Sequence, residues 1–81
     1  MKIMLYTIWD RVAEEAGPII CAKNDAVAVR NFRNYTKDVR EDEYRLYRVG
    51  EYDNEKVMIF GLDGRPEEVV VAAVPMETEV N

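Results

Sequence analysis

The chain has 81 residues, 48% of them hydrophobic, and a formal net charge of −5. That length gives one small domain with a small core, and that hydrophobic content argues against a disordered chain. The sequence contains no histidine and no serine, so the usual general base and the ordinary nucleophile arrangements are missing. We therefore expect no enzyme.

The cysteine content and the absence of long apolar runs suggest a compartment. The single cysteine, Cys21, lies in an apolar run and cannot form an internal disulfide, so we expect a buried, unreactive thiol in a reducing environment. No stretch approaches the roughly 20 apolar residues of a membrane span, and the first ten residues are too few and too polar for a signal peptide. We expect a cytoplasmic protein without membrane contact.

Two strands are predicted before the helix. The segment Lys2–Asp10 is rich in β-forming residues, and both alternating sets of its side chains are largely apolar. We therefore expect a central strand that is covered on both sides. The breaker pair Gly17-Pro18 ends a polar link and begins a second short strand, Pro18–Ala22, which can pair antiparallel with the first.

A helix follows, with Asn24 as its N-cap and Asp25 in its first turn. The spacing predicts that it ends near Asp38 and buries one face on the sheet. That face consists of Ala28, Val29, Phe32, Tyr35 and Thr36. Basic residues at i, i+3 and i+7 form a stripe beside it, which we call the helix stripe: Arg30, Arg33 and Lys37.

The second half of the chain reads as strands. Two alternating runs within Glu43–Leu62 flank the turn formers Asp53 and Asn54, which predicts a hairpin with Val57 already in its second strand. After a turn at Asp63–Pro66, the apolar run Glu68–Val74 predicts a buried last strand.

The predicted fold is α+β. It is a single domain, residues 1–75, with an antiparallel sheet of about five strands in the order ββαβββ and one helix packed on one face. Residues 76–81 are expected to form an acidic, flexible tail. So small a domain has an edge strand or apolar face to cover, so we also expect a homodimer.

Basic and aromatic residues gather in the middle of the chain. Six of the eleven basic residues lie between Arg30 and Arg48, where the net charge is +2. Aromatic rings beside basic side chains are typical of single-stranded nucleic-acid binding. In the segment YRLYR, Arg45 and Tyr47 share one strand face, whereas Arg48 lies with Tyr44 on the other.

A structural interpretation competes with this one, and the residues by themselves favour it. One tyrosine of each face would pack on the helix, and the arginines would pair with Glu41, Asp42, Glu51 or Glu55. The run Glu41-Asp42-Glu43 is a candidate cation site, but adjacent carboxylates in a loop are usually a solvated turn. We therefore expect no metal and no cofactor.

Four short segments resemble a known family in their order and spacing. They are MLYTIWD (4–10), NDAVAVRNF (24–32), EDEY (41–44) and LYRVGEYD (46–53). They are similar to segments of the small nonstructural protein of gokushovirus-type microviruses, phages with single-stranded circular DNA genomes. The chain departs from that pattern at Glu41, where the family often has proline, and at Ile19-Ile20, where relatives often have aromatic residues.

The resemblance implies a DNA-binding protein of genome replication or packaging, outside the capsid and in the host cytoplasm. Arg30 matches a motif position and lies off the apolar face, which points to a phosphate contact. The predicted nucleic-acid-binding residues are Arg30, Arg33, Lys37, Arg45, Tyr47 and Arg48.

Two other functions remain open. The first is an acidic interaction module that binds a replication, host-defence or coat protein without nucleic-acid affinity; Glu67, Glu68, Glu77 and Glu79 motivate it. The second is a helper of capsid assembly.

Overall fold

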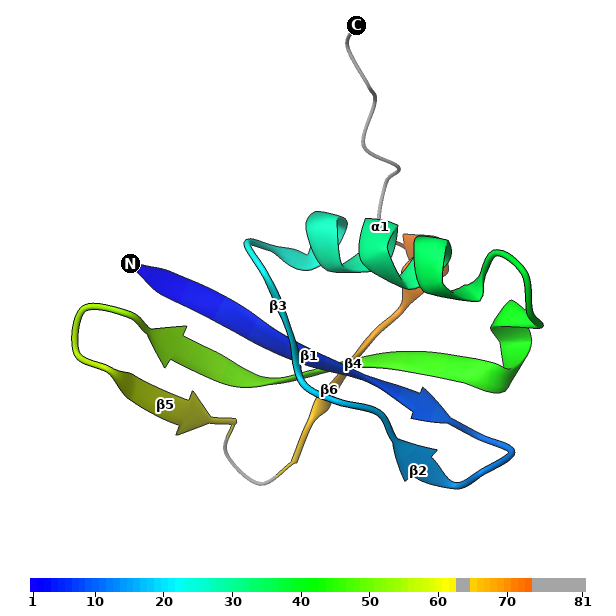
Figure 1. The fold of residues 1–81 in the computed structure, drawn as a ribbon, viewed down its shortest axis with the longest axis horizontal. Helices are drawn as coiled ribbons and strands as arrows, with labels where there is room; N and C mark the ends of the chain where they lie inside the picture. Colours follow the sequence, from blue (N-terminus) through cyan, green and yellow to red (C-terminus); the bar gives the residue numbers. More distant parts are fainter. Residues whose placement is uncertain (63–64, 74–81) are drawn as a thin grey trace, which may run out of the picture.

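A computed structural model describes residues 1–62 and 65–73 of the chain. This part contains a six-stranded antiparallel sheet and one α-helix (Figure 1). The strands are β1 (Lys2–Asp10), β2 (Glu15–Ala16), β3 (Ile20–Ala22), β4 (Tyr44–Asp53), β5 (Met58–Gly61) and β6 (Glu67–Val69). The helix is α1 (Asp25–Thr36), and two 3-10 turns are η1 (Glu41–Glu43) and η2 (Val71–Ala73). The protein is thus mostly β.

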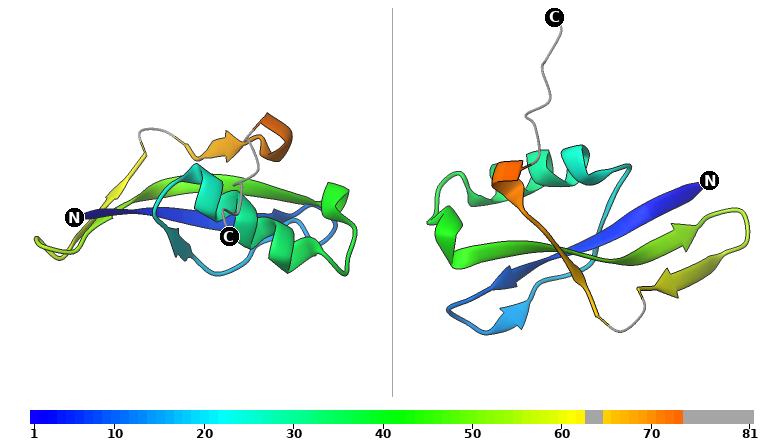
Figure 2. Two further views of the ribbon diagram at one scale, coloured as in Figure 1. Left: turned by 90° about the horizontal axis from the view of Figure 1, so that it is seen from above. Right: turned by 180° about the vertical axis from the view of Figure 1, so that it is seen from behind.

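The sheet is built on two long strands. β1 and β4 pair antiparallel from one end to the other. The outer edge of β1 carries β3 and then β2, and the outer edge of β4 carries β6 and then β5. Each edge is thus split between two short strands. The sheet curls into a half-barrel, and β3 and β6 run toward α1 (Figures 1 and 2).

The core lies between the helix and the curled sheet. Side chains of four strands meet one side of α1 there. The buried apolar residues of this cluster are Tyr6, Ala22, Ala28, Val29, Phe32, Leu46 and Val69. Burial of this apolar surface is the main term that holds α1 on the sheet.

The helix begins where the sequence predicts. The Asn24 side chain accepts a 2.9 Å hydrogen bond from the backbone N–H of Val27 and so caps the helix. The helix ends at Thr36, two residues before the predicted end. Tyr35 was predicted on the buried face, and this is wrong: its side chain is 61% exposed and meets Tyr44 edge-to-face at the periphery of the core.

The predicted hairpin is confirmed, with one shift. The Asp53 carboxylate accepts hydrogen bonds of 3.0 and 3.1 Å from the backbone N–H groups of Glu55 and Lys56, which fixes the turn. Val57 lies in the left-handed region (φ 57°), so it closes the turn and β5 begins one residue later, at Met58.

The middle of β4 contains a β-bulge. The pairing register with β1 shifts there, and Val49 is the extra residue, between Arg48 opposite Tyr6 and Gly50 opposite Leu5. A Cβ on Gly50 would collide with the carbonyl oxygen of Phe60 on β5. Glycine at this position therefore permits the close approach of two strands.

Three predictions about the strands are wrong. The link expected between the first two strands contains β2, because Glu14 (φ 58°) reverses the chain and Gly17 N–H then donates to Ile8 C=O at 3.0 Å. The second predicted strand begins at Ile20 rather than Pro18. The last strand stops at Val69, and Val70 is exposed.

The chain leaves the sheet after Val69 because it turns toward the helix. At η2 the carbonyl of Val71 accepts a hydrogen bond from Arg33 Nη2 at 3.3 Å. Val74, the predicted tail and the turn residues Asp63 and Gly64 lie outside the described residues.

The predicted burial of Cys21 is also wrong. The neighbouring Ala22 points into the core, so alternation along β3 turns the Cys21 thiol outward, where it is exposed. Within residues 1–62 and 65–73, no helix is both long and apolar enough to cross a membrane.

Candidate nucleic-acid interface

The structure distributes the six predicted binding residues over two sides of the sheet. Leu46 packs in the core with α1, so its neighbour Tyr47 points to the opposite side. We call that side the helix-free face; Thr7, Trp9, Arg45 and Tyr47 share it through their cross-strand pairs. The helix stripe and Arg48 belong to the other side. The structure therefore does not gather all six residues into one track.

The helix stripe remains exposed along much of its length. Arg30 and Lys37 are exposed, and Arg33 is half-buried because its guanidinium reaches the carbonyl of Val71. Among the described residues, neither Arg33 nor Lys37 forms an ion pair. This stripe therefore presents positive charge that can attract a phosphate.

Arg48 is engaged by two carboxylates. Its Nη2 lies 2.7 Å from Glu67 Oε1, and its Nη1 lies 3.5 Å from Asp25 Oδ1. The hydrogen bond with Glu67, followed by the charges of Asp25 and Glu67, raises the pKa of Arg48. Two negative charges already offset this cation, so its role is to join β4 to the helix and β6.

Arg45 lies at the edge of the helix-free face. Its Nη1 donates to the carbonyl oxygens of Asp42 and Tyr44 at 3.0 and 2.9 Å, and its Nε lies 3.6 Å from Glu68. Both members of the pair with Glu68 are substantially exposed, and such surface pairs contribute little free energy. A phosphate can replace Glu68 at low cost.

The competing structural interpretation was therefore right that these arginines pair with carboxylates, but wrong about which ones. The partners lie on β6 and at the start of α1, and they are not Glu41, Asp42, Glu51 or Glu55. The reason is topological, because β6 pairs with the first half of β4. This pairing places Glu67 opposite Arg48, and Glu68 opposite Tyr47, two residues from Arg45.

The helix-free face holds two aromatic rings around a hollow. This aromatic hollow has a volume of about 440 Å³ and is lined by Thr7, Trp9, Ala16, Tyr47, Val49 and Pro66. Tyr47 pairs with Thr7, and Arg45 pairs with Trp9, so ring, ring and guanidinium occupy adjacent positions on two strands. Such a surface is able to stack unpaired bases and to hold a phosphate beside them.

Trp9 is the site residue that the sequence analysis missed. The first strand was expected to be covered on both sides, and this holds only for its middle: Leu5 and Thr7 are buried, whereas Ile3 and Trp9 are partly exposed. The signal was present in the alternation, which places Trp9 on the face of Thr7. Trp9 becomes part of a site only because β1 pairs with β4, which brings its ring beside Arg45 and Tyr47.

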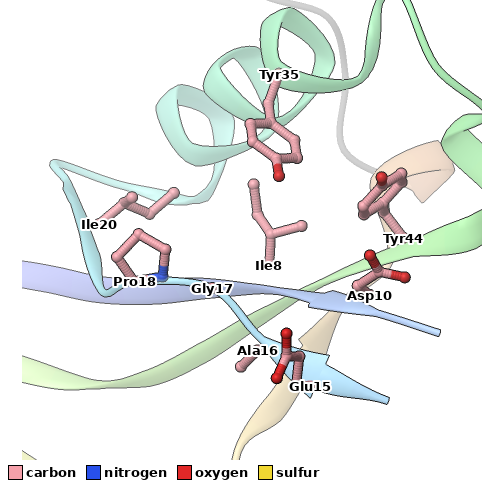
Figure 3. Close-up of a pocket in the computed structure, with 9 residues that line it drawn as sticks. All are labelled: Ile8, Asp10, Glu15, Ala16, Gly17, Pro18, Ile20, Tyr35 and Tyr44. Atoms are coloured by element: carbon pink, nitrogen blue, oxygen red, sulfur yellow. The ribbon is translucent and has the colours of Figure 1, made fainter. Parts of the chain in front are cut away.

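A second hollow lies on the helix side of the sheet (Figure 3). This acidic hollow has a volume of about 310 Å³ and is lined by Ile8, Asp10, Glu15, Ala16, Gly17, Pro18, Ile20, Tyr35 and Tyr44. Figure 3 shows Tyr35 pointing from α1 toward Ile8, with Asp10 beside the Tyr44 ring. Burial and then the charge of Asp10 raise the pKa of the Tyr44 hydroxyl. Two carboxylates and two rings above an apolar floor suit a cationic group.

The described part of the chain contains no group of three or more Cys, Asp or Glu side chains placed to hold a metal ion. The run Glu41-Asp42-Glu43 forms η1, and Asp42 is paired with Arg40 at 3.1 Å. The hydrogen bond from Arg40 lowers the pKa of the Asp42 carboxyl.

The chain matches a known protein family. Residues 3–75 match the family model described as Phage ORF5 protein. No curated protein and no solved structure shows a significant match to the chain.

Proposed function

This chain belongs to the Phage ORF5 protein family, and we propose that it binds single-stranded DNA through its helix-free face. The aromatic hollow carries the proposal, because it sets Trp9 and Tyr47 on adjacent strands with Arg45 beside them. Stacking on such rings tolerates any base sequence, since every base has a π-face. The phage family, together with the resemblance to a nonstructural protein of microviruses, supports a role in replication or packaging of a single-stranded genome.

In this proposal, Arg45 exchanges Glu68 for a phosphate of the bound strand. The exchange is inexpensive because the Arg45–Glu68 pair is exposed and 3.6 Å long. Arg48 takes no phosphate, since Asp25 and Glu67 already occupy it. The helix stripe supplies a second contact, which is purely electrostatic and faces the other side of the sheet.

The preference for single strands follows from geometry and charge. Rings reach base faces only where the bases are unpaired, and a chain of net charge −5 repels the dense charge of a duplex. No step of this function requires catalysis, and we propose a binding protein rather than an enzyme, acting in the host cytoplasm.

The test is fluorescence anisotropy of a labelled oligothymidylate titrated with the protein at low salt. Trp9→Leu and Tyr47→Leu keep the apolar volume but remove the rings, so each should weaken binding by about 1–3 kcal/mol, or roughly 5- to 150-fold. Tyr35→Leu is the matched control, because it removes an exposed ring that lies outside the aromatic hollow. It should leave the affinity unchanged.

Two results would overturn the proposal. One is the absence of saturable binding by the folded protein at low salt. The other is binding that Trp9→Leu and Tyr47→Leu leave intact, which would remove the helix-free face as the site.

The acidic hollow favours a second candidate function, the binding of a basic protein segment. A Lys or Arg side chain fits there, with its stem on Ile8 and its charge between Asp10, Glu15 and the tyrosine rings. Titration with a labelled lysine-rich peptide tests it, and Glu15→Gln with Tyr44→Leu should abolish that binding. Peptide binding that these changes do not affect would exclude the acidic hollow.

A further inference from the structure

The edge strand β5 is exposed along its whole length. Every one of its residues is exposed, with Ile59 at 71%, Met58 at 48% and Phe60 at 41%. β5 lies at the outer edge of the sheet, away from α1 (Figure 1). No charged residue occurs between Val57 and Leu62. Edge strands of monomeric proteins are usually protected by charge, proline or a cover, and among the described residues none of these protects β5.

The backbone of β5 faces outward at defined positions. Leu62 N–H donates to Val49 C=O at 3.3 Å, so this pair is a hydrogen-bonded pair of the antiparallel ladder. Because the two kinds of pair alternate, Phe60 and Met58 also bond to β4. The N–H and C=O groups of Ile59 and Gly61 therefore point away from the sheet, at its free edge.

We propose that this edge binds β5 of a second copy of the chain, antiparallel and across a two-fold axis. Val57 cannot extend the ladder, because its left-handed backbone ends the strand. The pairing that uses both outward residues sets Ile59 opposite the partner's Gly61, and Gly61 opposite the partner's Ile59. This register gives four main-chain hydrogen bonds and places the two Phe60 side chains opposite each other at the axis.

The chemistry of the edge favours a copy of itself as the occupant. Ile59 and Gly61 both point their backbone groups outward and are two positions apart. A two-fold rotation therefore brings each of them opposite the other in a second copy, as an isologous interface requires. Because β5 carries no charge, it offers no ion pair that would favour a charged partner, whereas two uncharged strands meet without repulsion. In the dimer, the apolar side chains of β5 lie on both faces of the joined sheet. Pairing the two strands therefore buries these side chains together with the backbone groups.

The geometry also orients the two copies. Antiparallel pairing of identical edge strands has its two-fold axis perpendicular to the sheet, so both helix-free faces point to the same side. The dimer would carry two aromatic hollows on one continuous surface. The interface itself is small, and we expect reversible association on the order of micromolar to millimolar dissociation constants.

Sedimentation equilibrium of the full chain over a wide concentration range tests the proposal. The wild type should show a monomer–dimer equilibrium, and Ile59→Lys should raise the dimer dissociation constant by at least about tenfold. Ile19→Lys is the matched control, since Ile19 is exposed at 56% and lies away from β5; it should change nothing. Circular dichroism establishes that each variant is folded.

Disulfide trapping tests the register independently of stability. In a Cys21→Ser background, Phe60→Cys should form an intermolecular disulfide rapidly, because the two positions face each other across the axis. Ile59→Cys should cross-link much more slowly, because its partner is Gly61. A wild type that remains monomeric at about 1 mM overturns the proposal. So does a dimer that Ile59→Lys leaves intact and Phe60→Cys fails to cross-link.

Discussion

The hydroxyl of Tyr6 donates a 2.6 Å hydrogen bond to Oδ1 of Asp25, the same oxygen that lies 3.5 Å from Nη1 of Arg48. Asp25 is the first residue of α1, Tyr6 is fully buried on β1, and Arg48 stands on β4. One carboxylate thus fastens the start of the helix to both long strands. It also holds Arg48 in place between the helix and β6.

Tyr6→Phe should lower the free energy of unfolding by about 1–2 kcal/mol, because it leaves the Asp25 oxygen without its buried donor. Chemical denaturation measures the change. Tyr35→Phe is the control, since that ring is exposed, and its effect should stay within about 0.5 kcal/mol. Equal effects of the two substitutions would contradict a stabilising role for the Tyr6 hydroxyl.

Asp53 should make the stability depend on pH in the acid range. The hydrogen bond from Lys56 N–H, and next that from Glu55 N–H, lower the pKa of its carboxyl below 3.8. A carboxyl whose pKa is lower in the folded state than in the unfolded state stabilises the fold fully at a pH above the unfolded-state pKa. This stabilisation is lost as the pH falls through the folded-state pKa. The wild type should therefore lose more stability than Asp53→Asn between neutral and strongly acid pH. Parallel curves for the two proteins would refute this.

Gly50→Ala should destabilise the protein by about 1–3 kcal/mol, because a Cβ there collides with the Phe60 carbonyl and forces β5 away from β4. Gly61→Ala provides the matched control, because its Cβ would have no neighbour within 4 Å. Thermal unfolding of both variants measures the difference. If the two glycines tolerated alanine equally, the close approach at Gly50 would not be a constraint.

The salt dependence of DNA binding should report the number of phosphates contacted. Neutralising about four phosphates on a single strand gives a log–log slope near −3. Removing two cations of the helix stripe with Arg33→Ala and Lys37→Ala should reduce that slope by about 1.4, while the exposed Lys56→Ala should leave it unchanged. A slope near zero for the wild type would eliminate the electrostatic contribution. A loss of all binding in the helix-stripe variant would place the DNA on the helix.

Local chemistry explains the predictions from sequence that succeeded. Asn24 caps the helix, Asp53 folds the turn and Asn54 follows in that turn, and each depends on groups only two or three residues away. The long, strongly alternating strands β1 and β4 were visible for the same reason. Partners that are distant in sequence were not visible. Glu68 meets Arg45 only because β6 pairs with β4, and that pairing leaves no local signal.

The candidate site shows the same division. Alternation correctly put Arg45 and Tyr47 on one face and Arg48 on the other. It could not reveal that α1 would cover the face of Leu46 and leave that of Trp9 open, because the choice of face depends on how the whole helix packs. The prediction for Tyr35 failed for a related reason: the last turn of the helix buries Thr36, but Tyr35 lies at the rim of the core, where its ring meets Tyr44.

The bulge at Val49 alters what the spacing of the tyrosines means. Tyr47 and Tyr52 are five residues apart, an odd interval that would send them to opposite sides of a regular strand. Because Val49 is the extra residue, Tyr47 stands opposite Thr7 and Tyr52 opposite Ile3, and both side chains share one face. The strand thus changes phase at its centre. Deleting Val49 would give a regular ladder and leave Tyr47 and Tyr52 on one face, whereas straightening the bulge with Val49 retained would turn half of this strand to the opposite face.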